Sequence, residues 1–124
     1  MKRVERFEDL EVYREAFALQ QDVFEVSKIW PPEERYALTD QIRRASRSIG
    51  ANIAEAWAKR RYEAHFLSKL TDADGELNET RHWLCTSLEC QYLPGATAAG
   101  LLERCNKIGG KIGRMIAGSS SWCE

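Results

Sequence analysis

The sequence predicts an all-α protein, organised as an antiparallel up-down-up-down four-helix bundle. Apolar residues recur at steps of three and four along nearly the whole chain, which is the period of an amphipathic helix. All three prolines fall in two short segments, 30–34 and 93–97, which indicates loops there. We therefore expect long helices with short connections in one domain of residues 1–118, followed by a flexible tail at residues 119–124.

Length and composition fit one domain that needs no disulfide bond or metal ion for its stability. The 124 residues are 44% hydrophobic and 30% charged, with a net charge of −1, and a domain of this size buries about two-thirds of its unfolded surface. There is no apolar run of roughly 18 residues and no signal-peptide pattern, so we expect a cytoplasmic protein that does not enter membranes. The cysteines are expected to be reduced and mostly buried, with a disulfide framework as the alternative. They are Cys85, Cys90, Cys105 and Cys123.

The first helix is expected from about residue 8 to residue 29, and its apolar face is unusually wide. One stripe comprises Val12, Ala16, Leu19, Val23, Val26 and Trp30. A second stripe beside it comprises Leu10, Tyr13, Phe17 and Phe24. A bundle core needs a face of only about 100°. The excess predicts an interface with another subunit, formed by Leu10, Tyr13, Phe17, Phe24 and Trp30.

Three further stripes predict three further helices. The second comprises Leu38, Ile42, Ala45, Ile49, Ile53 and Ala56. The third comprises Phe66, Leu70, Ala73, Leu77, Leu84 and Leu88, with Thr80 or Arg81 at its gap. The fourth comprises Ala98, Leu101, Cys105, Ile108, Ile112 and Met115.

A turn must lie between the second and third stripes, although no proline occurs from residue 33 to residue 92. A single helix of that length would be about 90 Å long, whereas a globular protein of this size has a radius of gyration of about 14 Å. We place the turn at residues 58–62, where the apolar stripe lapses and three cations follow one another.

The sequence contains no catalytic constellation. It has no Ser-His-acid order, no glycine-rich phosphate loop and no HExxH helix. Glu79, His82 and Cys85 are three residues apart on one helix, but they are fewer than the usual zinc ligands. A di-metal bundle would need a second Glu-x-x-His pair. We therefore expect no enzyme, no cofactor, no metal and no small-molecule substrate, and a carboxylate-lined metal or enzyme bundle is the lesser alternative.

A polar stripe runs beside the apolar one on the second helix. It comprises Gln41, Ser48, Asn52 and Glu55, and Glu79 joins it from the third helix. Asn52 and Glu55 lie among apolar neighbours, and polar groups that become buried need partners. The nearby arginines could supply them. The pattern predicts a buried hydrogen-bond network that fixes the register of the helices, with a paired-carboxylate site as the alternative.

Positive charge is concentrated in residues 41–61. This segment carries Arg43, Arg44, Arg47, Lys59, Arg60 and Arg61 against Glu55 alone, a net charge of +5. Residues 1–40 carry −4 and residues 62–124 carry −2. A basic helix in a nearly neutral protein could contact the phosphates of nucleic acid or a partner. The same cations could equally pair with acids of the first and third helices.

Three segments resemble the 23S rRNA intervening-sequence protein family. They are Phe7–Tyr13, Tyr36–Glu55 and Gly75–Leu84, and the resemblance extends from about Phe7 to Ile116. It implies a small cytosolic bacterial protein without enzymatic activity, folded as an antiparallel four-helix bundle and assembled in rings of five. A related branch, the accessory proteins of diversity-generating retroelements, binds a reverse transcriptase and nucleic acid.

The sequence departs from the family pattern at two positions. Ala56 stands where the family usually has a glycine, and Glu76 stands where it usually has a serine. The chain is also less basic than the retroelement branch. We therefore expect a pentameric scaffold that acts in assembly or binding, with itself and an RNA or RNA-associated protein as partners. Direct RNA binding through the second helix is the alternative.

Overall fold

The computed structural model describes residues 3–124, and every regular element in that range is a helix. The four long helices are α1 (Glu11–Ser27), α2 (Asp40–Ala58), α3 (Glu63–Glu89) and α4 (Gly95–Ala117). The short ones are η1 (Phe7–Asp9), η2 (Pro32–Glu34), η3 (Arg35–Thr39) and α5 (Ser119–Trp122). The predicted all-α class is confirmed. The first two residues of the predicted domain 1–118 lie outside the described part.

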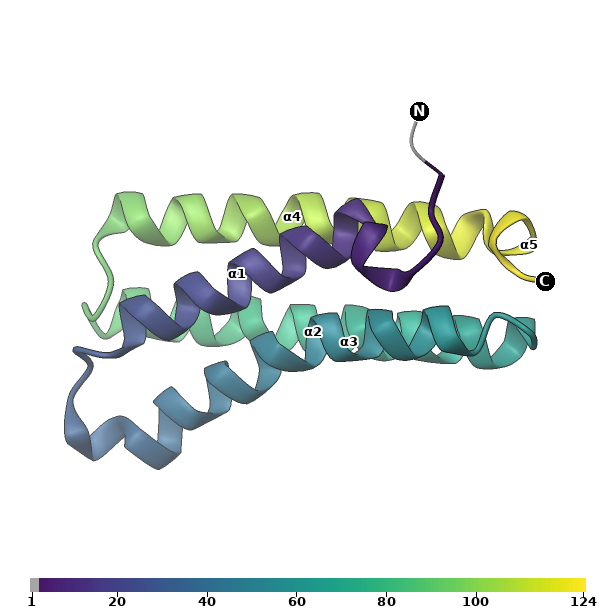
Figure 1. Ribbon diagram of the computed structural model, residues 1–124. Coiled ribbons are helices and arrows are strands. Elements are labelled where there is room, and N and C mark those ends of the chain that lie inside the picture. Colours follow the sequence, from purple (N-terminus) through teal and green to yellow (C-terminus); the bar gives the residue numbers. More distant parts are fainter. Residues whose placement is uncertain (1–2) are drawn as a thin grey trace.

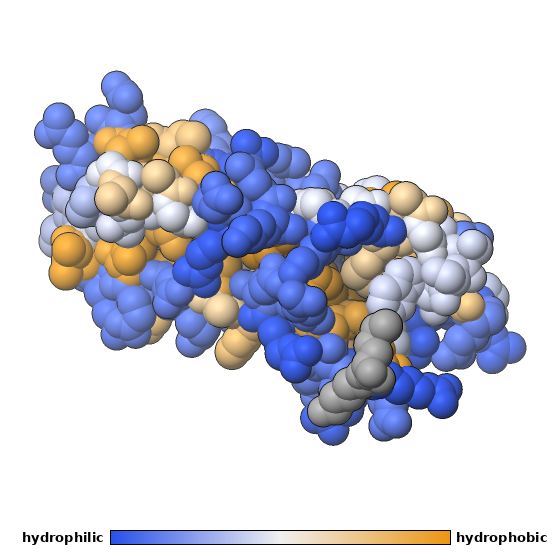
Figure 2. Space-filling view, turned by 90° about the horizontal axis from the view of Figure 1, so that it is seen from above, coloured by the Kyte–Doolittle hydropathy of each residue, from blue (hydrophilic) through white to orange (hydrophobic). Residues whose placement is uncertain are grey.

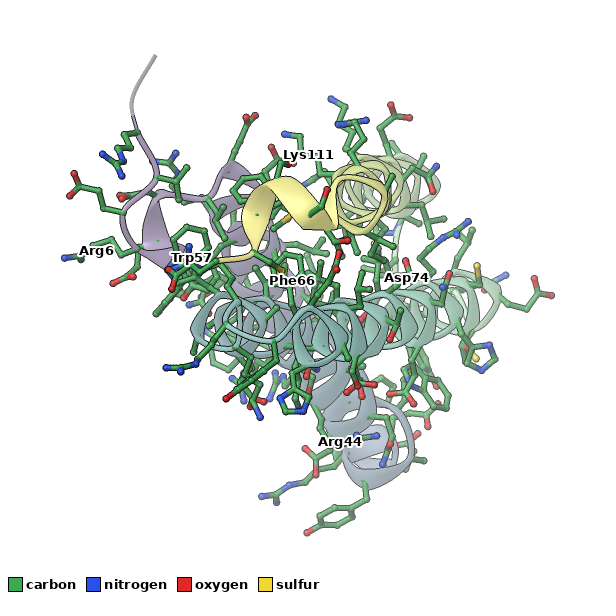
Figure 3. The ribbon with its side chains drawn as sticks, turned by 90° about the vertical axis from the view of Figure 1, so that its right-hand side faces the viewer. Arg6, Arg44, Trp57, Phe66, Asp74 and Lys111 are labelled. Atoms are coloured by element: carbon green, nitrogen blue, oxygen red, sulfur yellow. The ribbon has the colours of Figure 1, made fainter. Side chains whose placement is uncertain are left out.

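The chain reverses direction from each long helix to the next (Figure 1). α1 contacts α2 and α4, and α3 contacts the same two helices. The beginning of α2 leans outward, away from the other long helices (Figures 1 and 3). Within residues 3–124, none of the helices is both long and apolar enough to cross a membrane.

The predicted stripes form the core. All six residues of the second stripe and all six of the fourth are buried. Phe66 is fully buried and lies in the middle of the helices (Figure 3), and Thr80 fills the gap in the third stripe with no exposed surface. Burial of one large apolar side chain contributes about 1.5–3 kcal/mol. The prediction is wrong for Leu88, which is 39% exposed because it lies in the last turn of α3.

The connection between α1 and α2 is anchored to the loop after α3. The Tyr92 hydroxyl donates to Glu34 Oε2 at 2.8 Å, and the Trp30 and Tyr92 rings lie 6.1 Å apart. The hydrogen bond to Glu34 raises the pKa of Tyr92 to about 12. These contacts hold η2 beside the end of α3.

The turn between α2 and α3 occupies residues 59–62, which confirms the predicted position. No glycine ends α2. Instead Arg60 Nε donates to the Trp57 carbonyl oxygen at 2.8 Å, and its guanidinium lies 3.5 Å from the centroid of the Trp57 ring. The last carbonyls of a helix have no partner within the helix, and a basic side chain can satisfy one of them. One of the three cations therefore serves as a cap.

α3 ends in a Schellman motif that uses glutamine in place of glycine. Gln91 has a φ of 65°. Its N–H donates to the Leu88 carbonyl, and the N–H of Tyr92 donates to the Ser87 carbonyl. A residue with a Cβ pays a steric cost in this left-handed conformation. The loop before α4 is thus closed at some cost in strain.

Residues 119–124, the predicted flexible tail, include the short helix α5 (Ser119–Trp122). Trp122 packs against the core, with its ring 6.2 Å from that of Trp57. Ser119 is buried, and Arg60 forms an ion pair with Glu124 at 3.2 Å. The run of glycine and serines suggested disorder, but one tryptophan anchors it against α2.

Candidate interaction surface

The residues of the predicted network do share one face, which we call the polar strip: Gln41, Ser48, Asn52, Glu55 and Glu79. Arg44 links the two helices at one end of it. Its guanidinium donates to Gln41 Oε1 at 3.1 Å and to Glu79 Oε2 at 3.4 Å. This end of the strip therefore connects α2 with α3.

The predicted burial of the strip is wrong for the single chain. Glu55 is exposed and pairs with Lys69, not with an arginine, at 2.9 Å. This hydrogen bond lowers the pKa of Glu55 and raises that of Lys69. Asn52 is half-buried and donates to the Ser48 carbonyl at 2.9 Å. None of the five strip residues is fully buried, so the strip is a surface rather than a core network.

Two of the six predicted contact cations, Arg43 and Arg60, are drawn into the surface by contacts within the chain. Arg43 Nε donates to Ser27 Oγ at 2.8 Å, and its guanidinium lies 4.7 Å from the Phe24 ring centroid. Arg60 caps α2 and pairs with Glu124. Both side chains are half-buried. Their charge contributes to the fold, through contacts that tie α2 to α1 and to the C-terminus.

The remaining four cations do not form one continuous patch. Arg44, Arg47, Lys59 and Arg61 are exposed. Arg44 lies near the beginning of α2 and Lys59 directly after its end, which puts them about 22 Å apart at 1.5 Å per residue. Arg44 is also partly neutralised by Glu79 at 3.4 Å. The exposed cations of the basic segment 41–61 thus form two separate groups.

Most residues of the predicted oligomer interface on α1 are covered by contacts within the same chain. Leu10 and Trp30 are only 3% and 7% exposed and belong to the core, so they were wrongly assigned to the interface. Phe24 is half-buried beneath Arg43, Arg47 and Lys28. Only two of the five residues keep an outward face.

Tyr13 and Phe17 form that remaining apolar face. Tyr13 is half-buried, packs edge-on against Phe7 at 4.8 Å and stacks with Phe17 at 6.2 Å. A Cβ on Gly50 would lie 3.4 Å from the Tyr13 ring, so α2 approaches closely here. Phe17 is 41% exposed.

The structure adds an apolar site that the sequence did not indicate, which we call the α1–α2 corner. It is defined by Ile29 and Tyr36, which are 86% and 72% exposed. Neither residue lies on an apolar stripe, so periodicity gave no signal for them. Only their position on either side of the Pro31–Pro32 pair, in a predicted loop, could have drawn attention.

The residues of the proposed metal site are not brought together. Glu79 is paired with Arg44, while His82 and Cys85 are exposed. In the part of the chain that the structure describes, no three His, Cys, Asp or Glu side chains are grouped to hold a metal ion.

All four cysteines are free thiols. Cys105 is buried, and burial raises its pKa to about 11. Cys85 and Cys90 are exposed, so the expectation of mostly buried cysteines was wrong for them.

Comparison with known proteins shows similarity in both sequence and structure. The sequence matches the family model described as 23S rRNA-intervening sequence protein over residues 8–114. The structure is similar to a crystal structure from Bacteroides thetaiotaomicron of a protein with unknown function from the S23 ribosomal protein family. The TM-score is 0.78 at 26% identity, over 86% of this chain and 95% of that chain. No curated protein matches the sequence.

Proposed function

The chain belongs to the 23S rRNA-intervening sequence protein family, and from this premise we propose that it is a cytoplasmic, non-enzymatic assembly scaffold. In this proposal its four long helices act as an antiparallel up-down-up-down bundle. Copies of the chain associate in a ring, which the family resemblance suggests has five members, and the ring presents a surface to an RNA or an RNA-associated protein.

The α1–α2 corner is the observation that carries the proposal. Ile29 and Tyr36 are the two most exposed large apolar side chains of the described residues. Both lie in the segment that connects α1 to α2, before the part of α2 that leans away from the other long helices (Figure 1). Exposed apolar surface of this kind often marks a site of protein association. Burying one such side chain against a second copy would contribute about 2 kcal/mol.

A ring needs two different surfaces that meet between neighbouring copies. The apolar face of α1, with Phe17 41% exposed and Tyr13 stacked behind it, is the second surface that we assign. The corner of one copy would then pack on the α1 face of the next. Each copy would offer both surfaces, so the same contact could repeat until the ring closes.

Charge reversal at the corner tests this proposal. We expect the double variant Ile29→Glu, Tyr36→Glu to run as a smaller species than the wild type in size-exclusion chromatography with light scattering. Leu88→Glu is the matched control, because Leu88 is 39% exposed but lies on α3 outside both surfaces, and it should leave the mass unchanged. A double variant that keeps the wild-type mass would refute the role of the corner.

Direct RNA binding by α2 is the second candidate function. Arg47 is exposed, and within residues 3–124 no carboxylate pairs with it. Binding of structured RNA would be measured at two salt concentrations for the wild type and for Arg44→Gln, Arg47→Gln. If these arginines contact phosphates, the variant should bind more weakly and show a shallower salt dependence. Equal binding by both proteins would exclude this role.

A further inference from the structure

A cavity of about 440 Å³ lies away from the polar strip and from the corner. It opens between the N-terminal segment and the beginning of α1 on one side and the end of α4 and α5 on the other. This volume is within the ~300–1,000 Å³ that is usual for small-molecule sites. The assembly that we propose does not use this cavity.

Apolar side chains line much of the cavity. They are Val4, Leu10, Val12, Met115 and Trp122. Figure 2 looks onto the face that carries α1 and α4 and, to the right of its centre, shows apolar side chains in a hollow between hydrophilic ones. Trp122 is held in place by its edge contact with Trp57. The lining therefore suits an apolar or aromatic body rather than a fully hydrated ion.

Cations outnumber acids around the cavity. Arg3, Arg14, Lys111 and Arg114 line it against Asp9 and Glu11, an excess of two positive charges. Lys111, which Figure 3 shows between α1 and α4, is already neutralised by ion pairs with Glu11 and Glu15. The excess is therefore carried by the arginines.

Among residues 3–124, neither Arg14 nor Arg114 forms a direct ion pair with a carboxylate, and Arg14 acts on Glu11 only through its charge. Arg14 Nη2 donates only to the Asp9 carbonyl oxygen, at 3.1 Å. Arg114 folds back along α4, and its Nη1 lies 3.6 Å from the position that a Cβ on Gly110 would take. A guanidinium presents two parallel N–H groups that match a carboxylate or a phosphate. Both arginines thus retain donors for an anion.

We propose that this cavity binds one small amphipathic anion, with an acyl or aromatic body against Met115 and Trp122 and a single carboxylate or phosphate held by Arg14 and Arg114. The combination of an apolar lining with unpaired guanidinium groups selects against both purely apolar and purely ionic ligands. This inference departs from the sequence-based expectation that the chain takes no small molecule.

Calorimetric titration with decanoate and with decyl phosphate tests the proposal, and the two arms show which head group is preferred. We expect one molecule to bind per chain, and we expect Arg14→Gln, Arg114→Gln to weaken the binding at least tenfold. Arg81→Gln is the matched control, because Arg81 is exposed on α3 and lies outside the cavity. Decanol tests the need for charge, and acetate and inorganic phosphate test the need for the apolar body.

The result that overturns the proposal is an absence of saturable binding by either amphiphile, or equal affinity of the wild type and the double variant. Equal binding of decanol would refute the role of the arginines. An amide and indole NMR titration of the wild type with decanoate gives a second test that does not depend on the variants folding. The largest shifts must fall at the start of α1, the end of α4 and the Trp122 indole. Shifts confined to other helices would exclude this cavity.

Discussion

Two glycines of α4 should respond differently to the same substitution. Replacing a helical glycine by alanine stabilises a helix by about 1 kcal/mol where the methyl group has room. Apart from the local helix backbone, no atom of residues 3–124 lies within 4 Å of a Cβ built on Gly113, so Gly113→Ala should gain that full amount. Unfolding entropy scales at roughly 2.1 cal/mol/K per residue, so for a chain of this length 1 kcal/mol corresponds to about 4 °C in melting temperature.

Gly109→Ala is the matched variant. Its Cβ would lie 3.3 Å from Leu77 Cδ2, and Leu77 is buried on α3 with little freedom to move. The strain should cancel most of the helical gain, so we expect a melting temperature within about 2 °C of the wild type. Thermal unfolding followed by circular dichroism at one protein concentration measures both variants. The reasoning is refuted if Gly109→Ala stabilises as much as Gly113→Ala, or if Gly113→Ala destabilises the protein.

Three further outcomes follow from the structure. The melting temperature of Glu55→Ala should lie within about 2 °C of the wild-type value, because the ion pair of Glu55 with Lys69 is at the surface. A larger fall in melting temperature would support the buried network that the sequence predicted. Gln91→Gly should raise the free energy of unfolding by about 1 kcal/mol in urea titration, because glycine adopts a positive φ without the steric cost, and a loss of stability would contradict this account of the loop. At pH 8 iodoacetamide should label exposed Cys85 and leave Cys105 of the folded protein unlabelled, because burial raises the pKa of Cys105 to about 11. Mass spectrometry measures the labelling of each cysteine, and equal labelling of the two would contradict this expectation.

The apolar stripes could be predicted because helical periodicity depends only on spacing. The turn at residues 59–62 was also placed correctly, although no glycine or proline marks it. The decisive signal was the run of cations, and the structure shows why: Arg60 caps the end of α2. In both cases the determining interactions are local in sequence.

The surface could not be predicted in the same way, because it depends on contacts between distant residues. The second stripe of α1 was assigned to a partner, yet Leu10 is buried in the core and Phe24 is covered by arginines of α2. The cavity is lined by two groups of residues, 3–14 and 111–122, which are about a hundred positions apart in the sequence. The helix α5 is held by a contact between Trp122 and Trp57. None of these pairings leaves a periodic signal.

Sedimentation equilibrium of the wild-type protein at micromolar concentration tests the central claim most directly. The scaffold that we propose predicts a single species with five times the 14.2 kDa mass of the chain. A dimer or tetramer would contradict the number that rests on the family resemblance. A monomer at every concentration would contradict the assembly function itself, and the exposed corner would then need another explanation.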